Sequence, residues 1–244
     1  MEMAKTNSNS EKGKLYLIPT TLGDSAPLEV LPISIKRAIE NIDHYIAENE
    51  KTARRFIKKL STNKPQGGLH FETLNKFTEP SEIPNYLNPC HNGLDVGLLS
   101  EAGCPAIADP GANVVSIAHD KKIQVVPLVG PSSILLAMMA SGMNGQSFAF
   151  NGYLPIDNAE RKNRVKKFER LSKETGQAQI FIETPYRNDK LLTELIRLLH
   201  QNTKLCIAAD ISLQTETIYT KSIQEWKNVS IDLHKRPAIF IIQA

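Results

Sequence analysis

The residues best suited to holding a ligand lie in one loop, residues 100–111, which reads Ser-Glu-Ala-Gly-Cys-Pro-Ala-Ile-Ala-Asp-Pro-Gly. Glycine permits positive φ and a close approach of ligand to backbone, whereas proline fixes φ and removes a backbone donor. An apolar run precedes the loop at 96–99, and a helical pattern follows it at 114–119. A plain strand-to-helix turn needs roughly two to six residues, and this loop is about twice as long. Its length favours a binding loop over an ordinary turn.

Three further loops follow predicted strands, at residues 19–24, 130–133 and 183–187. Parallel sheets bind ligands at the carboxyl ends of their strands, so these loops point to a common site. They offer backbone amides and carbonyls but few charges, which suits a mostly neutral ligand. The sequence has no GxxxxGK followed by Ser or Thr, no GxGxxG before the first helix and no GxSxG. A P-loop NTPase, a dinucleotide-binding Rossmann site and a serine hydrolase are therefore disfavoured.

Charged side chains that could act on a substrate fall into basic and acidic groups. One basic helix face, with no acidic residue from 52 to 71, is formed by Lys51, Arg54, Arg55, Lys58 and Lys59. It is either solvated or tracks nucleic-acid phosphates. A second cluster holds Arg161, Lys162, Arg164, Lys166 and Lys167.

The acidic candidates for a general base are Asp24, Glu48 and Glu101. A base must lie within hydrogen-bond reach of the proton that it removes. A helix cap or a loop ion pair explains each carboxylate at least as well, so no catalytic base is assigned. Arg187 follows a strand end, where it either reaches the site or forms a structural ion pair.

Composition restricts the remaining possibilities. The 244 residues are 41% hydrophobic, which is enough for a substantial core, and the net charge of +3 permits but does not demand a nucleic-acid partner. Three scattered cysteines without CxxC, and histidines without HxxxH, predict no metal site and no disulfide framework. The longest apolar stretch, 134–140, is too short to span a bilayer, and the polar start at 1–14 is unlike a signal peptide. We expect a cytoplasmic protein without membrane association.

Strand and helix patterns alternate along the first half of the chain. Strands are predicted at 15–18, 44–47, 96–99 and 123–129, and helices at 30–42, 51–60, 81–87 and 112–121. Residues 61–78 read as a loop. This β-α-β order predicts a mostly parallel sheet.

The second half predicts a mixed sheet. Its strands are expected at 148–153, 178–182, 205–209, 216–220 and 238–242, and its helices at 135–141, 159–174 and 188–200. We therefore predict an α/β protein with a disordered tail at 1–13 and two α/β domains, 14–129 and 130–244.

Five sequence blocks, in order, carry a resemblance that covers residues 14–244. They are 15–19, 98–111, 126–133, Gly152-Tyr153-Leu154-Pro155 and 183–187. Together they resemble the tetrapyrrole (corrin/porphyrin) methylase superfamily, and more closely its ribosomal branch, the small-subunit ribosomal RNA 2′-O-methyltransferase I group. The resemblance implies two α/β domains with an S-adenosylmethionine cleft between them, and a homodimer.

Carried over by position, the resemblance assigns a set of cofactor-binding residues. These are Leu22, Gly103, Cys104, Pro105, Ile107, Ser133, Ile134, Thr184, Pro237 and Ala238. On the substrate side it leaves Glu48, Arg54, Arg55 and Arg187 as candidates.

The chain departs from the branch at several blocks, and several of the lost groups are polar residues on the substrate side. Its acidic pair before Thr-Arg becomes Glu48-Asn49, and its Tyr-His-x-His-Asn block becomes residues 71–75, Phe-Glu-Thr-Leu-Asn. The leading hypothesis is a methyltransferase acting on a ribose 2′-hydroxyl of small-subunit ribosomal RNA. A small-molecule, tetrapyrrole-like methylase and a non-catalytic cofactor-binding partner of RNA are the alternatives.

Overall fold

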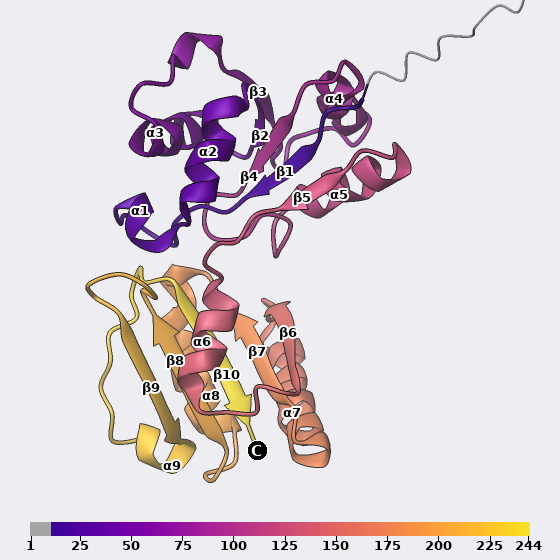
Figure 1. The fold of residues 1–244 in the computed structure, drawn as a ribbon. Helices are drawn as coiled ribbons and strands as arrows, with labels where there is room; N and C mark the ends of the chain where they lie inside the picture. Colours follow the sequence, from indigo (N-terminus) through magenta and orange to yellow (C-terminus); the bar gives the residue numbers. More distant parts are fainter. Residues whose placement is uncertain (1–10) are drawn as a thin grey trace, which may run out of the picture. The chain divides into compact units, whose positions relative to one another are not determined.

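The computed structural model describes residues 11–244, so most of the predicted disordered tail, 1–13, lies outside the described residues. The described chain forms two compact units. The first holds the chain up to Thr21 together with Ser25–Pro131, and the second holds Leu22–Asp24 together with Ser132–Ala244. Each unit is an α/β structure built on its own five-stranded sheet (Figure 1).

The first unit contains a fully parallel sheet in the order β3-β2-β4-β1-β5. Its strands are β1 (Leu15–Ile18), β2 (His44–Ala47), β3 (His70–Thr73), β4 (Val96–Leu99) and β5 (Val125–Pro127). The central strand β4 is buried along its whole length, as expected for a parallel strand covered on both faces. All five carboxyl ends therefore lie at one edge of the sheet.

Helices cover both faces of this sheet. They are α1 (Pro27–Val30), α2 (Ile33–Asn41), α3 (Glu50–Leu60), α4 (Asn88–His91) and α5 (Gly111–Asp120), with 3-10 turns η1 (Gln66–Gly68) and η2 (Ile83–Leu87). Helices α2 and α3 bury Ile39 and Ile57 on one face. On the other face, α4, α5 and η2 bury residues such as Cys90 and Val114.

Two local predictions for the first unit are wrong. The helix predicted to start at Val30 begins only at Ile33, because Pro32 lacks the backbone N–H that a helix continuing from Val30 would require, and Val30 is instead the last residue of α1. The loop predicted at 61–78 contains β3, an edge strand with only Phe71 partly buried. A strand so exposed lacks the apolar alternation by which sequence patterns reveal strands.

The second unit contains a mixed sheet in the order β6-β7-β10-β8-β9. Its strands are β6 (Phe148–Tyr153), β7 (Ala178–Ile182), β8 (Lys204–Ala209), β9 (Thr217–Ser222) and β10 (Ala238–Gln243). Its helices are α6 (Ser133–Ser141), α7 (Asn158–Thr175), α8 (Asn188–Leu198) and α9 (Ile223–Trp226), with the 3-10 turn η3 (Pro185–Arg187). The predicted α/β class, with a parallel first sheet and a mixed second sheet, is confirmed.

Alternating residues of the second sheet face two separate cores. Phe181, Ile207 and Phe240 pack with α7, α8 and α9, whereas Ile180, Ala208 and Ile241 pack with α6. This period of two is the direct consequence of strand geometry. Within residues 11–244, no helix is long and apolar enough to cross a membrane.

Candidate cofactor-binding site

The loop after β4 is held in place by the loop after β1. The Thr20 amide donates to the Gly103 carbonyl at 3.0 Å, and the Ser100 hydroxyl donates to the same oxygen at 2.7 Å. Gly103 has φ of 73°, a conformation that costs glycine little. The over-long loop is thus an ordered structure fixed by main-chain bonds.

A carboxylate closes the second half of this loop. Asp109 Oδ1 accepts hydrogen bonds from the Ala106 and Gly111 amides, each at 2.8 Å. A side chain at Gly111 would approach that oxygen to 2.9 Å, so only glycine fits without displacement. Ala106 and Ala108 adopt φ of 67° and 60°, a strained left-handed conformation for a non-glycine residue. Asp109 is therefore part of the loop's framework.

The loop after β5 contacts the loops after β1 and β4. A Cβ on Gly130 would lie 2.2 Å from Pro19 Cβ, so Gly130 packs directly against the proline side chain. Cys104 Sγ lies 3.4 Å from the Pro131 carbonyl oxygen and 3.8 Å from that of Gly130. Burial raises the pKa of the Cys104 thiol, which keeps it a neutral filler. Loops from three strands thus converge at the carboxyl edge of the first sheet.

This edge suits a neutral, partly apolar ligand. Ile107 is 54% exposed and Val129 is 75% exposed, although both are large apolar residues on the converging loops. Gly103 and Pro105 of the same loop as Ile107 are buried. The structure therefore brings four of the predicted cofactor residues, Gly103, Cys104, Pro105 and Ile107, into one loop with uncovered apolar surface.

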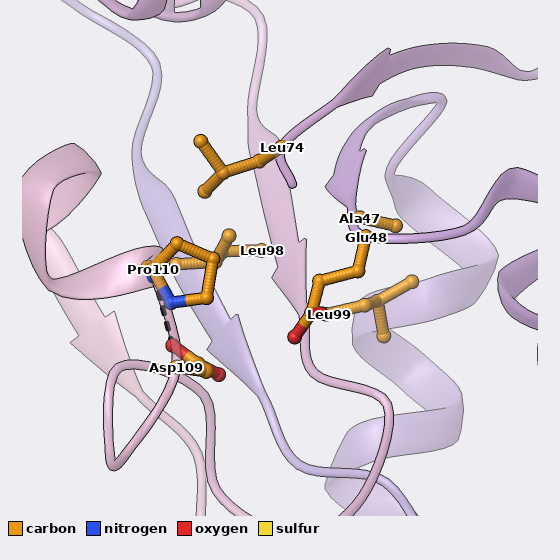
Figure 2. A pocket seen from close by; sticks show the side chains of 8 residues that line it. Ala47, Glu48, Leu74, Leu98, Leu99, Asp109 and Pro110 are labelled. Carbon is orange, nitrogen blue, oxygen red and sulfur yellow. Dashed lines mark hydrogen bonds between the residues drawn. The ribbon is translucent and has the colours of Figure 1, made fainter. Parts of the chain in front are cut away.

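A small hollow lies beside this loop, between the ends of β2 and β4 (Figure 2). Its walls are mainly apolar and are formed by Ala47, Leu74, Leu98, Leu99 and Pro110. The carboxylate of Glu48 points into the hollow, toward the side where Asp109 lies. Burial raises the pKa of Glu48, and the nearby charges of Asp109 and Glu101 raise it further.

The three carboxylates differ in their partners. Asp109 is bonded to two amides, and Glu101 accepts a hydrogen bond from the Thr52 hydroxyl at 2.8 Å. Within the described part of the chain, no hydrogen bond or ion pair engages the Glu48 carboxylate. Glu48 is thus the one available to a ligand.

The two predicted arginines of α3 occupy different environments. Arg54 donates to Glu50, to the Gln66 carbonyl at 2.5 Å and to the Leu69 carbonyl at 3.1 Å. Its guanidinium also lies 4.6 Å from the centre of the Phe71 ring. Arg55 is exposed to solvent. Arg54 therefore fastens the segment before β3, and only Arg55 has a guanidinium open to a substrate.

In the second unit, the predicted residues gather at one end of the sheet. The strand register places the carboxyl end of β7 and the amino end of β10 side by side, with Ile182 opposite Ile239. Thr184 follows the first of these ends, and Pro237 and Ala238 form the second. Arg187 donates to Glu183 at 2.5 Å and to Thr184 at 3.1 Å, so its guanidinium forms the structural ion pair.

Leu22 and the start of α6 also belong to this second unit. Leu22 and Ile134 pack against the core beneath α6. A Cβ on Gly23 would lie 2.7 Å from Leu213 Cδ1, in the loop that follows β8. Ser133 is the first residue of α6, and the side chain of the preceding Ser132 makes no capping bond.

Arg236 is an important residue that sequence reasoning did not identify. Its guanidinium forms an ion pair with Asp210 at 2.7 Å and donates to the Thr215 and Asp232 carbonyls. It thereby fixes the backbone just before Pro237. Because Asp210 and Thr215 are 26 and 21 residues away in the sequence, no local pattern could reveal this role.

Comparison with known proteins gives this arrangement a family context. No family model matches the chain. The ribosomal RNA small subunit methyltransferase I of Bacillus subtilis is 29% identical over 225 residues, which cover 91% of this chain and 73% of the relative. The protein of that name from Escherichia coli O157:H7 is 24% identical over 240 residues, covering 97% and 80%. The predicted resemblance is confirmed.

Solved structures agree on the fold. The methyltransferase CobJ has a TM-score of 0.63 at 14% identity, covering 95% of this chain and 94% of that one. Uroporphyrin-III C-methyl transferase from Thermus thermophilus, complexed with S-adenyl homocysteine, has a TM-score of 0.55 at 15% identity, covering 95% and 97%. With the curated relatives, these findings confirm the predictions of a methyltransferase and of S-adenosylmethionine as its cofactor.

Proposed function

We propose that this methyltransferase transfers a methyl group from S-adenosylmethionine to a ribose 2′-hydroxyl of small-subunit ribosomal RNA. The observation that carries the proposal is similarity to ribosomal RNA small subunit methyltransferases I over 86–97% of the chain in the first three relatives compared. The converging loops of the first unit support it, because they form an ordered edge with uncovered apolar surface.

The protein's main task in this reaction is positioning. S-adenosylmethionine supplies a methyl group already activated by its sulfonium. The loop of Gly103, Cys104, Pro105 and Ile107 would hold the cofactor through backbone contacts and apolar packing. Leu22, Ser133, Ile134, Thr184, Pro237 and Ala238 are the residues proposed to hold it in the second unit. A fixed geometry between methyl group and hydroxyl supplies much of the rate enhancement.

Glu48 is the group proposed to take the proton from the ribose hydroxyl. A partly desolvated carboxylate with a raised pKa is a better base toward a hydroxyl than an exposed one. Glu48 meets this description, and its carboxylate is not engaged by another described residue. Asp109 and Glu101 have framework partners, so they contribute charge and not proton transfer.

Labelled methyl transfer tests the proposal. Purified small ribosomal subunits, free ribosomal RNA and a tetrapyrrole are each incubated with the protein and S-adenosylmethionine labelled in its methyl group. The proposal expects label in RNA or in subunits, with the tetrapyrrole unlabelled. Label in the tetrapyrrole would establish the small-molecule reaction, and cofactor binding without any transfer would establish a non-catalytic partner of RNA.

Dimerisation and cytoplasmic location also belong to the proposal. Light scattering at several protein concentrations measures the mass of the particle. A mass of twice 27.1 kDa is expected for the homodimer.

A further inference from the structure

A groove with basic side chains along one wall lies on the second unit, away from Thr184, Pro237 and Ala238. It encloses about 610 Å³ and is lined by α7 from Lys166 to Lys173, by the turn that includes His200 and Thr203, and by Ala244. Lys204 at the start of β8 pairs with Gln243 at the end of β10. Thr203 and Ala244, which line the groove, are the next residues along, so the groove lies at this end of the sheet. The groove thus lies at the opposite end of this sheet from Thr184, Pro237 and Ala238.

Three cations on α7 face this groove. Lys166, Arg170 and Lys173 are three or four residues apart, a spacing that places them on one side of a helix. The Lys166 side chain is 48% exposed and that of Arg170 is 72% exposed, so both reach solvent at the mouth of the groove. Arg170 lies 3.8 Å from Glu174, an exposed pair that costs little to separate.

The carboxylate in the groove is committed to the protein. Glu169 accepts from the His200 amide at 2.5 Å and from the Thr203 hydroxyl at 2.8 Å, and Lys166 donates to it at 3.2 Å. Burial alone would raise the pKa of Glu169, but these hydrogen bonds lower it. Glu169 therefore stays ionised and holds the turn that forms the second wall. The three cations, Lys166, Arg170 and Lys173, face Glu169 in the groove and Glu174 at its edge, so the cations outnumber the carboxylates by one.

We infer that this groove binds backbone phosphates of the RNA substrate. The inference rests on the proposed function. Five residue steps along β8 separate Ala209 from Lys204, which corresponds to roughly 17 Å at about 3.3 Å per residue. A ligand that touches both ends of the sheet must be extended. Among the proposed substrates, only a polymer such as RNA meets this requirement.

The test compares two variants with the same loss of charge. The groove variant carries Lys166→Gln, Arg170→Gln and Lys173→Gln. The control carries Arg164→Gln and Lys167→Gln, exposed on the same helix, and Lys190→Gln, exposed on α8. Glutamine keeps helix propensity close to that of lysine and arginine. Fluorescence anisotropy with a labelled transcript of small-subunit ribosomal RNA, over a series of salt concentrations, gives Kd and its salt dependence.

The groove variant should raise Kd on the order of tenfold or more. The slope of log K against log salt should fall by about 0.7 for each lost contact to single-stranded RNA, or by about 2 for three contacts. A second variant, Lys166→Arg with Lys173→Arg, should bind like the wild type because phosphate needs only the charge. Thermal melting by circular dichroism confirms that each variant is folded.

Equal Kd and slope in the groove and control variants would overturn the inference while leaving the proposed function intact. Loss of binding in the groove variant of a protein that methylates no RNA would sink the proposed function alone. A wild type that binds no RNA would overturn both.

Discussion

At the scale of single residues, some charged side chains are bonded to the protein's own backbone, whereas others are open to a ligand. Asp109, Arg54 and Arg236 each form hydrogen bonds with backbone groups, so they belong to the framework. Glu48 is different, because its carboxylate faces an apolar hollow without a hydrogen-bond partner in the described chain.

Replacing Glu48 with glutamine should separate activity from stability. As proposed general base, its loss should slow methyl transfer on the order of a hundredfold. Cofactor affinity, measured by calorimetry, should stay close to that of the wild type. Glu79→Gln, at an exposed position, serves as the control. Unchanged transfer rates in Glu48→Gln would remove Glu48 from the mechanism.

Glu48→Gln should slow methyl transfer but stabilise the folded protein at neutral pH. Because the pKa of Glu48 is raised in the folded state, its ionised carboxylate destabilises the fold at neutral pH, and this cost disappears as the pH falls and the group is protonated. Glu48→Gln should therefore raise Tm at about pH 8. The gain should shrink as the pH falls through the raised pKa of Glu48, and it should be lost below the unfolded-state pKa of about 4.3. A gain of the same size at both pH values would contradict the assigned cause.

Gly130→Ala tests how closely the loops of the first unit are packed. The added Cβ would lie 2.2 Å from Pro19 Cβ, so the loops must separate. We expect a loss of about 1–3 kcal/mol in the free energy of unfolding and weaker binding of S-adenosylmethionine. Gly145→Ala, where a Cβ meets nothing within 4 Å, should change stability by less than about 0.5 kcal/mol. Equal effects of the two changes in urea denaturation would refute the packing argument.

At the scale of elements, the sequence was informative where apolar spacing is regular. The buried faces of α3 and α8 follow that spacing, and so do β4, β7 and β8. The exposed β3 and the short α9 leave no such pattern. Contacts between distant residues could not be predicted either, so the sequence grouped Arg161 with the four exposed cations Lys162, Arg164, Lys166 and Lys167.

Arg161 in fact belongs to the interior of the second unit. It is 6% exposed and forms two hydrogen bonds with Glu194, at 2.6 and 2.8 Å. Glu194→Ala would leave this cation buried without its partner and should cost about 3 kcal/mol in urea denaturation. Glu174→Ala breaks only the exposed pair with Arg170 and should cost less than about 1 kcal/mol. Similar losses would show that the Arg161 pair is solvated.

Helix α3 carries both a cation that is bonded to the protein backbone, Arg54, and exposed cations that could bind RNA. Arg55→Gln combined with Lys58→Gln removes two exposed cations and should weaken RNA binding with little change in Tm. Arg54→Gln removes the bonds to Gln66 and Leu69, so it should lower Tm. RNA binding unaffected by the double variant would clear α3 of a role in RNA recognition.

At the scale of the whole molecule, the candidate site could be predicted only in part. Loop length and strand ends located the loops, and the resemblance identified the cofactor. The substrate side could not be read in the same way, because the segments 47–52 and 71–75 depart from the related pattern. A modest net charge of +3 hides the concentration of cations on α3 and α7. The acceptor of the methyl group must therefore be identified by a methyl-transfer assay.

The most direct test is the position of the transferred methyl group. Small ribosomal subunits are incubated with the protein and methyl-labelled S-adenosylmethionine, and the extracted RNA is hydrolysed in alkali. Alkaline cleavage requires a free 2′-hydroxyl, so a 2′-O-methylated nucleotide survives as a labelled dinucleotide. The account predicts label in alkali-resistant dinucleotides, with the signal reduced on the order of a hundredfold by Glu48→Gln. Label in mononucleotides, or in no RNA at all, would contradict it.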